Sequence, residues 1–109
     1  MKSKDNYYDL VFEVTRRIPS GKVSTYGAIA DYLSLGSARM VGWALNNSFG
    51  QDIPAHRVVN RKGELSGRVH FPSPDMMQER LEQEGVEIKD SKLVDFKAHF
   101  WHPEEYEDC

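Results

Sequence analysis

The chain has 109 residues, enough for one domain with a single core, and its 39% hydrophobic and 28% charged residues are typical of a globular protein. No apolar run approaches the ~20 residues that a membrane span requires, and no secretory signal is visible, so we expect a cytoplasmic protein. The single cysteine, Cys109, excludes an internal disulfide framework.

The net charge of −3 conceals a marked asymmetry. Residues 1–72 carry 10 Lys and Arg against 6 Asp and Glu, which gives +4. Residues 73–109 carry 4 against 11, which gives −7. Binding to a polyanion depends on the local field rather than on the total charge, so a nucleic-acid partner is compatible with this sequence. An acidic C-terminus is also a common solubility device, and both interpretations stay open.

The N-terminal part predicts three helices. Apolar residues recur at helical spacing over 6–18, and Pro19-Ser20-Gly21 ends that helix. Ser24 is expected to cap a second helix over about 25–34, and Ser37 a third helix that runs to Asn46. Two short helices joined by a glycine-containing turn form the helix-turn-helix pattern, a common DNA-binding motif.

The third helix has the composition of a helix that approaches a nucleic acid closely. Ala38, Gly42 and Ala44 are small, and Arg39 is its only charged residue. Small side chains allow contact with a sugar-phosphate wall, and the arginine can reach into a base stack. Trp43 could serve as a base-stacking platform, but we expect it to pack between helices.

The second half predicts fewer regular elements. Val58-Val59 is typical of a short buried strand, residues 60–63 of a turn, and Glu64–Arg68 of a loop. Ser73-Pro74-Asp75 predicts the start of a helix that ends at Gly85. We therefore expect a mostly α, single helical domain with a winged-helix-like helix-turn-helix motif and at most one small strand pair. Its core spans about 6–88, and an acidic aromatic extension covers 89–109, whose aromatic residues either pack on the domain, as we expect, or bind a partner.

The segment Ile53-Pro54-Ala55-His56-Arg57-Val58-Val59 resembles the active-site signature of the O6-alkylguanine-DNA alkyltransferase family, which reads Pro-Cys-His-Arg-Val. In that family the cysteine takes the alkyl group from a flipped guanine. Ala55 stands at the cysteine position here, and a methyl side chain can neither form a thiolate nor accept an alkyl group. The resemblance therefore implies an alkyltransferase-like member of the family that is not an enzyme.

Four further segments resemble the family in the same order along residues 6–88. Tyr26 resembles the tyrosine that pushes on the phosphate beside the flipped nucleotide, and Arg39 the finger that fills the space left by the base. The family also has a hinge asparagine, which corresponds here to Asn46 or Asn47. We assign this role to Asn47. Leu65-Ser66-Gly67 resembles the loop over the flipped base, with Leu65 at a position where the family has tyrosine. The last segment is Leu81-Glu82-Gln83-Glu84-Gly85, whose Glu84 orients His56 in the family.

The resemblance implies three groups of site residues. The pair His56 and Glu84 is read as a structural remnant of the family's proton relay, and Arg57 as a brace for loop carbonyls. No catalytic residue, cofactor or metal is expected, because the four histidines lack ligand spacing and Cys109 lies in an acidic tail that suppresses its thiolate. The residues assigned to DNA binding and base flipping are Tyr26, Ser37, Ala38, Arg39, Gly42 and Asn47, and those assigned to the lesion pocket are Tyr26, Ala55, Val58, Leu65, Ser66 and Arg68.

The function implied is that of a monomer that binds O6-alkylguanine in double-stranded DNA through the minor groove, flips the base and marks it for nucleotide excision repair proteins. Ala55 in place of cysteine is expected to leave room for alkyl groups larger than methyl. One alternative is an alkyltransferase domain that carries an introduced Cys-to-Ala change at position 55. Another is a plain helix-turn-helix regulator, which predicts a sequence preference, a dimer and indifference to lesions.

Overall fold

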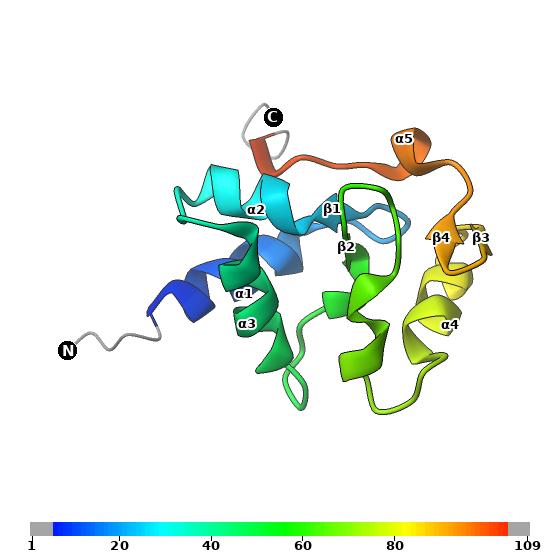
Figure 1. Ribbon diagram of the computed structural model, residues 1–109, viewed down its shortest axis with the longest axis horizontal. Helices are drawn as coiled ribbons and strands as arrows, with labels where there is room; N and C mark the ends of the chain where they lie inside the picture. The colour runs from blue at the N-terminus through cyan, green and yellow to red at the C-terminus, as the bar shows by residue number, and fades with distance from the viewer. Residues whose placement is uncertain (1–5, 105–109) are drawn as a thin grey trace.

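The computed structural model describes residues 6–104. Helices dominate it, as the sequence predicts, and the strands are two residues long (Figure 1). The predicted strand at Val58–Val59 is confirmed, and a second strand pair is present beyond the one expected. The elements in chain order are α1 (Asn6–Arg17), β1 (Ser24–Thr25), α2 (Tyr26–Tyr32), α3 (Ala38–Asn46), the 3₁₀ helix η1 (Ala55–Arg57), β2 (Val58–Val59), the 3₁₀ helix η2 (Ser66–His70), α4 (Met76–Gln83), β3 (Ile88–Lys89), β4 (Lys92–Leu93) and α5 (Phe96–His99).

The three N-terminal helices form one side of the molecule and α4 with β3 and β4 the other, with β2 and η2 between them (Figure 1). Strands β1 and β2 pair in parallel, with Ser24 opposite Val58 and Thr25 opposite Val59. This pairing joins the start of the helix-turn-helix to the segment that follows the signature. One continuous core runs through both sides, and its fully buried members include Val11, Ile29, Val41, Val58, Met77 and Leu81.

The helix-turn-helix is capped at both helix starts, but not entirely by the predicted residues. Ser37 caps α3, its hydroxyl accepting a hydrogen bond from the backbone N–H of Arg39 at 3.0 Å, as predicted. The prediction that Ser24 caps α2 is wrong. Thr25 takes that role and accepts from the N–H of Ala28 at 3.0 Å, because Ser24 is drawn into β1 and buried. Helix α2 therefore spans only Tyr26–Tyr32.

The second half differs from the prediction at two places. The segment expected to be a loop over Glu64–Arg68 contains η2, a five-residue 3₁₀ helix from Ser66 to His70. Helix α4 begins at Met76 instead of beside Pro74, because Ser73 forms a turn in which its carbonyl accepts from the N–H of Met76. Gly85 ends α4 with φ +90°, a conformation that glycine adopts without strain.

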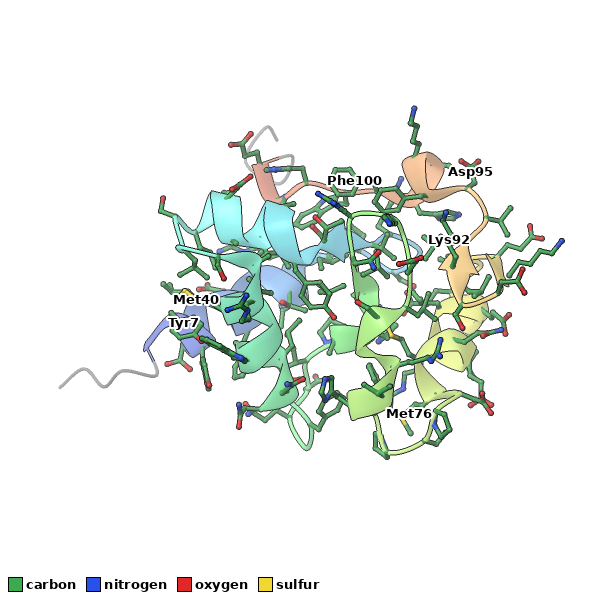
Figure 2. All side chains as sticks on the ribbon, viewed as in Figure 1. Tyr7, Met40, Met76, Lys92, Asp95 and Phe100 are labelled. Carbon is green, nitrogen blue, oxygen red and sulfur yellow. The ribbon has the colours of Figure 1, made fainter. Side chains whose placement is uncertain are left out.

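The C-terminal segment folds back over the domain. Strands β3 and β4 form an antiparallel hairpin, and the chain then returns toward α2 (Figure 1). Phe100 lies on this returning stretch, at the edge of the molecule opposite to Met76 (Figure 2). Backbone hydrogen bonds tie this stretch to Val23, whose carbonyl accepts from the N–H of Trp101 at 2.7 Å. Trp101 is buried, which confirms that it packs on the domain. Residues 105–109, and with them Cys109, lie outside the described residues.

Neither a membrane span nor a metal cluster is evident between residues 6 and 104. In that range no helix is long and apolar enough to cross a bilayer. No group of three or more His, Cys, Asp or Glu side chains in that range is arranged to hold a metal ion.

Candidate nucleic-acid interface

A surface cavity lies between the exposed face of α3 and η2. Its volume is about 400 Å³ and its lining is mainly apolar. Helix α3 contributes Ala38, Gly42 and Asn46 to the lining, and its small side chains leave the space open. Tyr26 at the start of α2 closes one part of the wall. We call this space the outer cavity.

Tyr26 is held against η2 by two close approaches. Its hydroxyl hydrogen-bonds with the side chain of Ser66. A Cβ atom placed on Gly67 would stand 2.6 Å from the same oxygen, closer than real Cβ contacts allow, so glycine is required for this packing. Burial raises the pKa of Tyr26, and the Ser66 hydrogen bond opposes that shift only in part. Tyr26 is therefore a neutral phenol at physiological pH.

Ala55 lies deeper than the outer cavity, in the first turn of η1, and only 7% of its surface is exposed. It lines a separate inner cavity of about 20 Å³, which shares Tyr26, Gly42 and Gly67 with the outer one. That volume holds about one water molecule. Phe71 and the end of α3 line this small space, so the structure does not show the room expected next to Ala55 for large alkyl groups.

His56, Arg57 and Glu84 form the predicted pair with a third member. The Glu84 carboxylate accepts from His56 Nε2 at 2.8 Å and from Arg57 Nη2 at 2.7 Å. The backbone N–H of Gly21 donates to the same carboxylate at 3.1 Å. Arg57 Nη1 also donates to the carbonyl of Ile18 at 2.8 Å, which confirms its role as a brace. The motif thus ties α4 and η1 to the turn after α1.

The protonation states follow from these contacts. Partial burial would raise the pKa of Glu84, but the hydrogen bonds from Arg57, His56 and Gly21 outweigh it and hold the pKa at about 2. Burial lowers the pKa of His56 despite the attraction of Glu84. His56 is therefore neutral near pH 7, with the proton on Nε2 because a carboxylate can only accept. Its buried Nδ1 has no hydrogen-bond partner in the described part of the chain.

Exposed cations line two openings beside Tyr26. Arg39 lines the outer cavity, and within residues 6–104 no ion pair or hydrogen bond holds its side chain. Tyr26 also lines a second cleft of about 490 Å³, whose charged residues are Arg61, Lys62 and the single carboxylate Glu64. Tyr26 thus lines two openings that each carry positive charge, an arrangement that suits a polyanionic backbone crossing over it.

The structure brings together only part of the predicted site. The outer cavity contains the predicted residues Tyr26, Ala38, Arg39, Gly42 and Ser66, and Ser37 lies next to it as the cap of α3. Asn46 lines the cavity, whereas Asn47 turns away, its side chain donating to the carbonyl of Trp43 at 2.9 Å.

Three predicted pocket residues line neither cavity. Val58 and Leu65 are buried in the core, with 0% and 2% of their surface exposed. Arg68 donates to the hydroxyl of Ser91 at 2.5 Å and lines a different cleft, beside the β3–β4 turn. Arg68 lies away from both cavities because its partner, Ser91, belongs to the turn between β3 and β4.

The prediction that Trp43 packs between helices is wrong. Half of its surface is exposed, and it lines the outer cavity. The spacing of Val41, Ala44 and Leu45 marks the buried face of α3, so positions 39 and 43, four residues apart, share the other face. That periodicity is the signal that could have placed Trp43 correctly.

Comparison with known proteins agrees with this geometry. Residues 6–86 match the family described as 6-O-methylguanine DNA methyltransferase, DNA binding domain. The chain is 39% identical to alkyltransferase-like protein 1 of Schizosaccharomyces pombe over 91% of its own length and 97% of the relative's. It is 35% identical to the DNA base-flipping protein of Escherichia coli, over 94% and 79% of the two lengths.

Among solved structures, the fold is similar to that of S. pombe Atl1 in complex with damaged DNA containing O6-carboxymethylguanine. The TM-score is 0.80 at 37% sequence identity, and the match covers 94% of this chain and all of the other. With the family match over 81 of its 109 residues and relatives of this similarity, the chain belongs to the 6-O-methylguanine DNA methyltransferase family, through that family's DNA-binding domain.

Proposed function

We propose that this protein is a non-enzymatic DNA-damage recognition protein that binds O6-alkylguanine in duplex DNA through the minor groove and turns the damaged base out of the stack. The proposal rests on the position of Tyr26. Its hydroxyl lies against Ser66 and Gly67, and its side chain lines two cavities that both contain basic residues. The names of the relatives, which include base-flipping proteins, support it.

The division of labour follows from the chemistry of the side chains. Extrusion of a base costs a few kcal/mol, and less when the base is damaged and poorly paired. Arg39 is exposed and unpaired among the described residues, so its guanidinium is free to enter the vacated space and stack there. The small residues Ala38 and Gly42 let α3 approach the groove wall.

The absence of alkyl transfer follows from Ala55. A nucleophile is needed to accept an alkyl group, and alanine provides none. His56 and Glu84 act in this proposal as a structural pair that holds η1 against α4. The sole cysteine is Cys109, far from Ala55 in sequence.

Recognition without repair requires a second system, and we infer that the bound protein marks the lesion for nucleotide excision repair as a monomer. The support is chemical. A protein that cannot remove the alkyl group contributes to repair only if other repair proteins detect the lesion through the bound protein. We also infer that the protein lies at the nucleoid when it is bound to DNA and in the cytoplasm otherwise.

Base extrusion can be tested directly with a duplex that carries a fluorescent purine analogue beside O6-methylguanine. Unstacking of the neighbour raises its emission, so binding is expected to raise fluorescence on the modified duplex and much less on an unmodified duplex of identical sequence. The same titration with Tyr26→Ala is expected to give binding without the rise. A rise of equal size on both duplexes, or none on either, would contradict base flipping.

A further inference from the structure

The outer cavity has an aromatic wall that the family signature does not explain. Trp43 lines it from α3, on the opposite side from η2, with half of the indole surface open. An exposed tryptophan is costly to keep in water, since the apolar surface gains from burial. The same face carries Arg39 one turn earlier, so the indole lies within the surface proposed to meet DNA.

The two cavities differ greatly in size. The inner cavity next to Ala55 holds about one water molecule, whereas the outer cavity has about 400 Å³. The inner cavity therefore has room for no more than a small O6 group such as methyl, and a bulkier group must extend from there into the outer cavity. The lining there includes the aromatic rings of Tyr26 and Trp43 and the small residues of α3, next to the polar side chains of Arg39, Asn46, Ser66 and His70.

We propose that Trp43 is the specificity-determining residue for the O6 substituent, and that its indole stacks on flat or apolar groups such as benzyl. The inference rests on the proposed function and adds the class of lesion preferred. Stacking of an aromatic ring on an indole gains dispersion and removes apolar surface from water, whereas a methyl group covers little of the ring. The preference for benzyl over methyl guanine thus depends on residue 43.

The test compares affinities of wild type, Trp43→Ala and Trp43→Phe for three duplexes of identical sequence that carry guanine, O6-methylguanine or O6-benzylguanine. Wild type is expected to prefer benzyl to methyl. The ratio of the affinity for the benzyl duplex to that for the methyl duplex is expected to fall about tenfold in Trp43→Ala and by less in Trp43→Phe. Both variants are expected to retain the preference of methylguanine over guanine, because Tyr26 and Arg39 are unchanged.

Val69→Ala is the matched control. Val69 is an exposed apolar residue of η2, with 71% of its surface open, but it lines the cleft beside Arg68 instead of the outer cavity. This variant is expected to reproduce the wild-type ratio. Circular dichroism checks that each variant is folded.

Intrinsic fluorescence gives a second readout. The chain has two tryptophans, and Trp101 is buried with 6% of its surface exposed, so a change on DNA addition reports mainly on Trp43. Quenching is expected to be larger with benzylguanine than with guanine. The inference is overturned if wild type binds benzyl and methyl duplexes equally, or if Trp43→Ala keeps the wild-type ratio. Equal binding of all three duplexes by wild type would instead overturn the proposed function itself.

Discussion

The hydroxyl oxygen of Tyr26 lies so close to the backbone of Gly67 that a Cβ atom there would stand only 2.6 Å away. The tyrosine from the start of α2 and the glycine of η2 are therefore matched in shape, although 41 residues separate them. This contact fixes the direction of the ring that is proposed to displace a nucleotide.

Replacement of Gly67 by alanine is expected to shift Tyr26 and leave the fold intact, because the clashing atom is the far end of a side chain. We expect the affinity for an O6-methylguanine duplex to fall about tenfold, since a small misplacement of a positioning group costs at least that much. Thermal unfolding should change little. Gly36→Ala is the control, because a Cβ there meets nothing within 4 Å and should leave affinity unchanged. Unchanged affinity in Gly67→Ala would remove Tyr26 from the proposed role.

Arg39→Ala is expected to abolish the preference for modified over unmodified DNA and to keep the melting temperature. The side chain is exposed and has no partner among the described residues, so its loss costs no core contact. Arg61→Ala, in the turn after β2, should instead weaken binding to both duplexes about equally and make it less salt-dependent. Lesion preference that survives in Arg39→Ala would show that another residue fills the vacated space.

Ala55→Cys is expected to give the chain an alkyl acceptor. The thiol would adjoin His56, whose Nδ1 is buried without a partner in the described part of the chain and can take its proton. Incubation with a duplex carrying labelled O6-methylguanine should transfer one label per chain at most, and wild type should take up none. Ala55→Ser separates thiol chemistry from mere volume, because a hydroxyl is a much weaker nucleophile. Label on the wild-type chain would contradict the non-enzymatic assignment.

Glu84 is expected to make the fold acid-sensitive. Its pKa is about 2 in the folded protein against an ordinary 4.5, so its contribution to stability is complete above pH 4.5 and is lost as the pH falls toward 2. The side chain is 14% exposed, and after allowance for solvent screening the contribution is about 2 kcal/mol. Glu84→Gln should therefore be less stable than wild type by roughly that free energy at pH 7.

The difference between Glu84→Gln and wild type should shrink as acid is added. Denaturant unfolding of both proteins at pH 7, 5, 4 and 3 measures it. Glu82→Gln, an exposed carboxylate two residues earlier on α4, is the control and should follow the wild-type pH profile closely. A difference between Glu84→Gln and wild type that stays constant down to pH 3 would show that the carboxylate charge is not what stabilises the motif.

The sequence predicts the helices well, and it predicts the site only where local patterns determine it. Ser37 as a cap and the exposure of Arg39 follow from the local pattern, and the pairing of His56 with Glu84 follows from the family resemblance. The prediction for Trp43 fails because its hydrophobicity alone favours burial, whereas its position on α3 lies on the exposed face. The close contact of Tyr26 with Gly67 could not be predicted, because no local pattern reports which distant backbone a side chain will meet.

The position of Arg68 shows a second kind of limit. Its partner, Ser91, lies in a two-residue turn in which Asp90 and Ser91 both adopt positive φ, at 55° and 61°. Such turns favour glycine or asparagine, so the sequence does not predict a hairpin there. The hairpin draws Arg68 toward β4. The motif match at residues 65–67 does not report the position of this hairpin, so it could not predict where Arg68 lies.

The central claim is tested most directly by competition between two duplexes of identical sequence, one with O6-methylguanine and one with guanine, for the wild-type protein at a fixed salt concentration. Salt must be held constant because phosphate contacts dominate the total affinity. The account predicts that the modified duplex displaces the unmodified one at a concentration at least about tenfold lower, with no label transferred to the protein. Equal displacement by the two duplexes would contradict it.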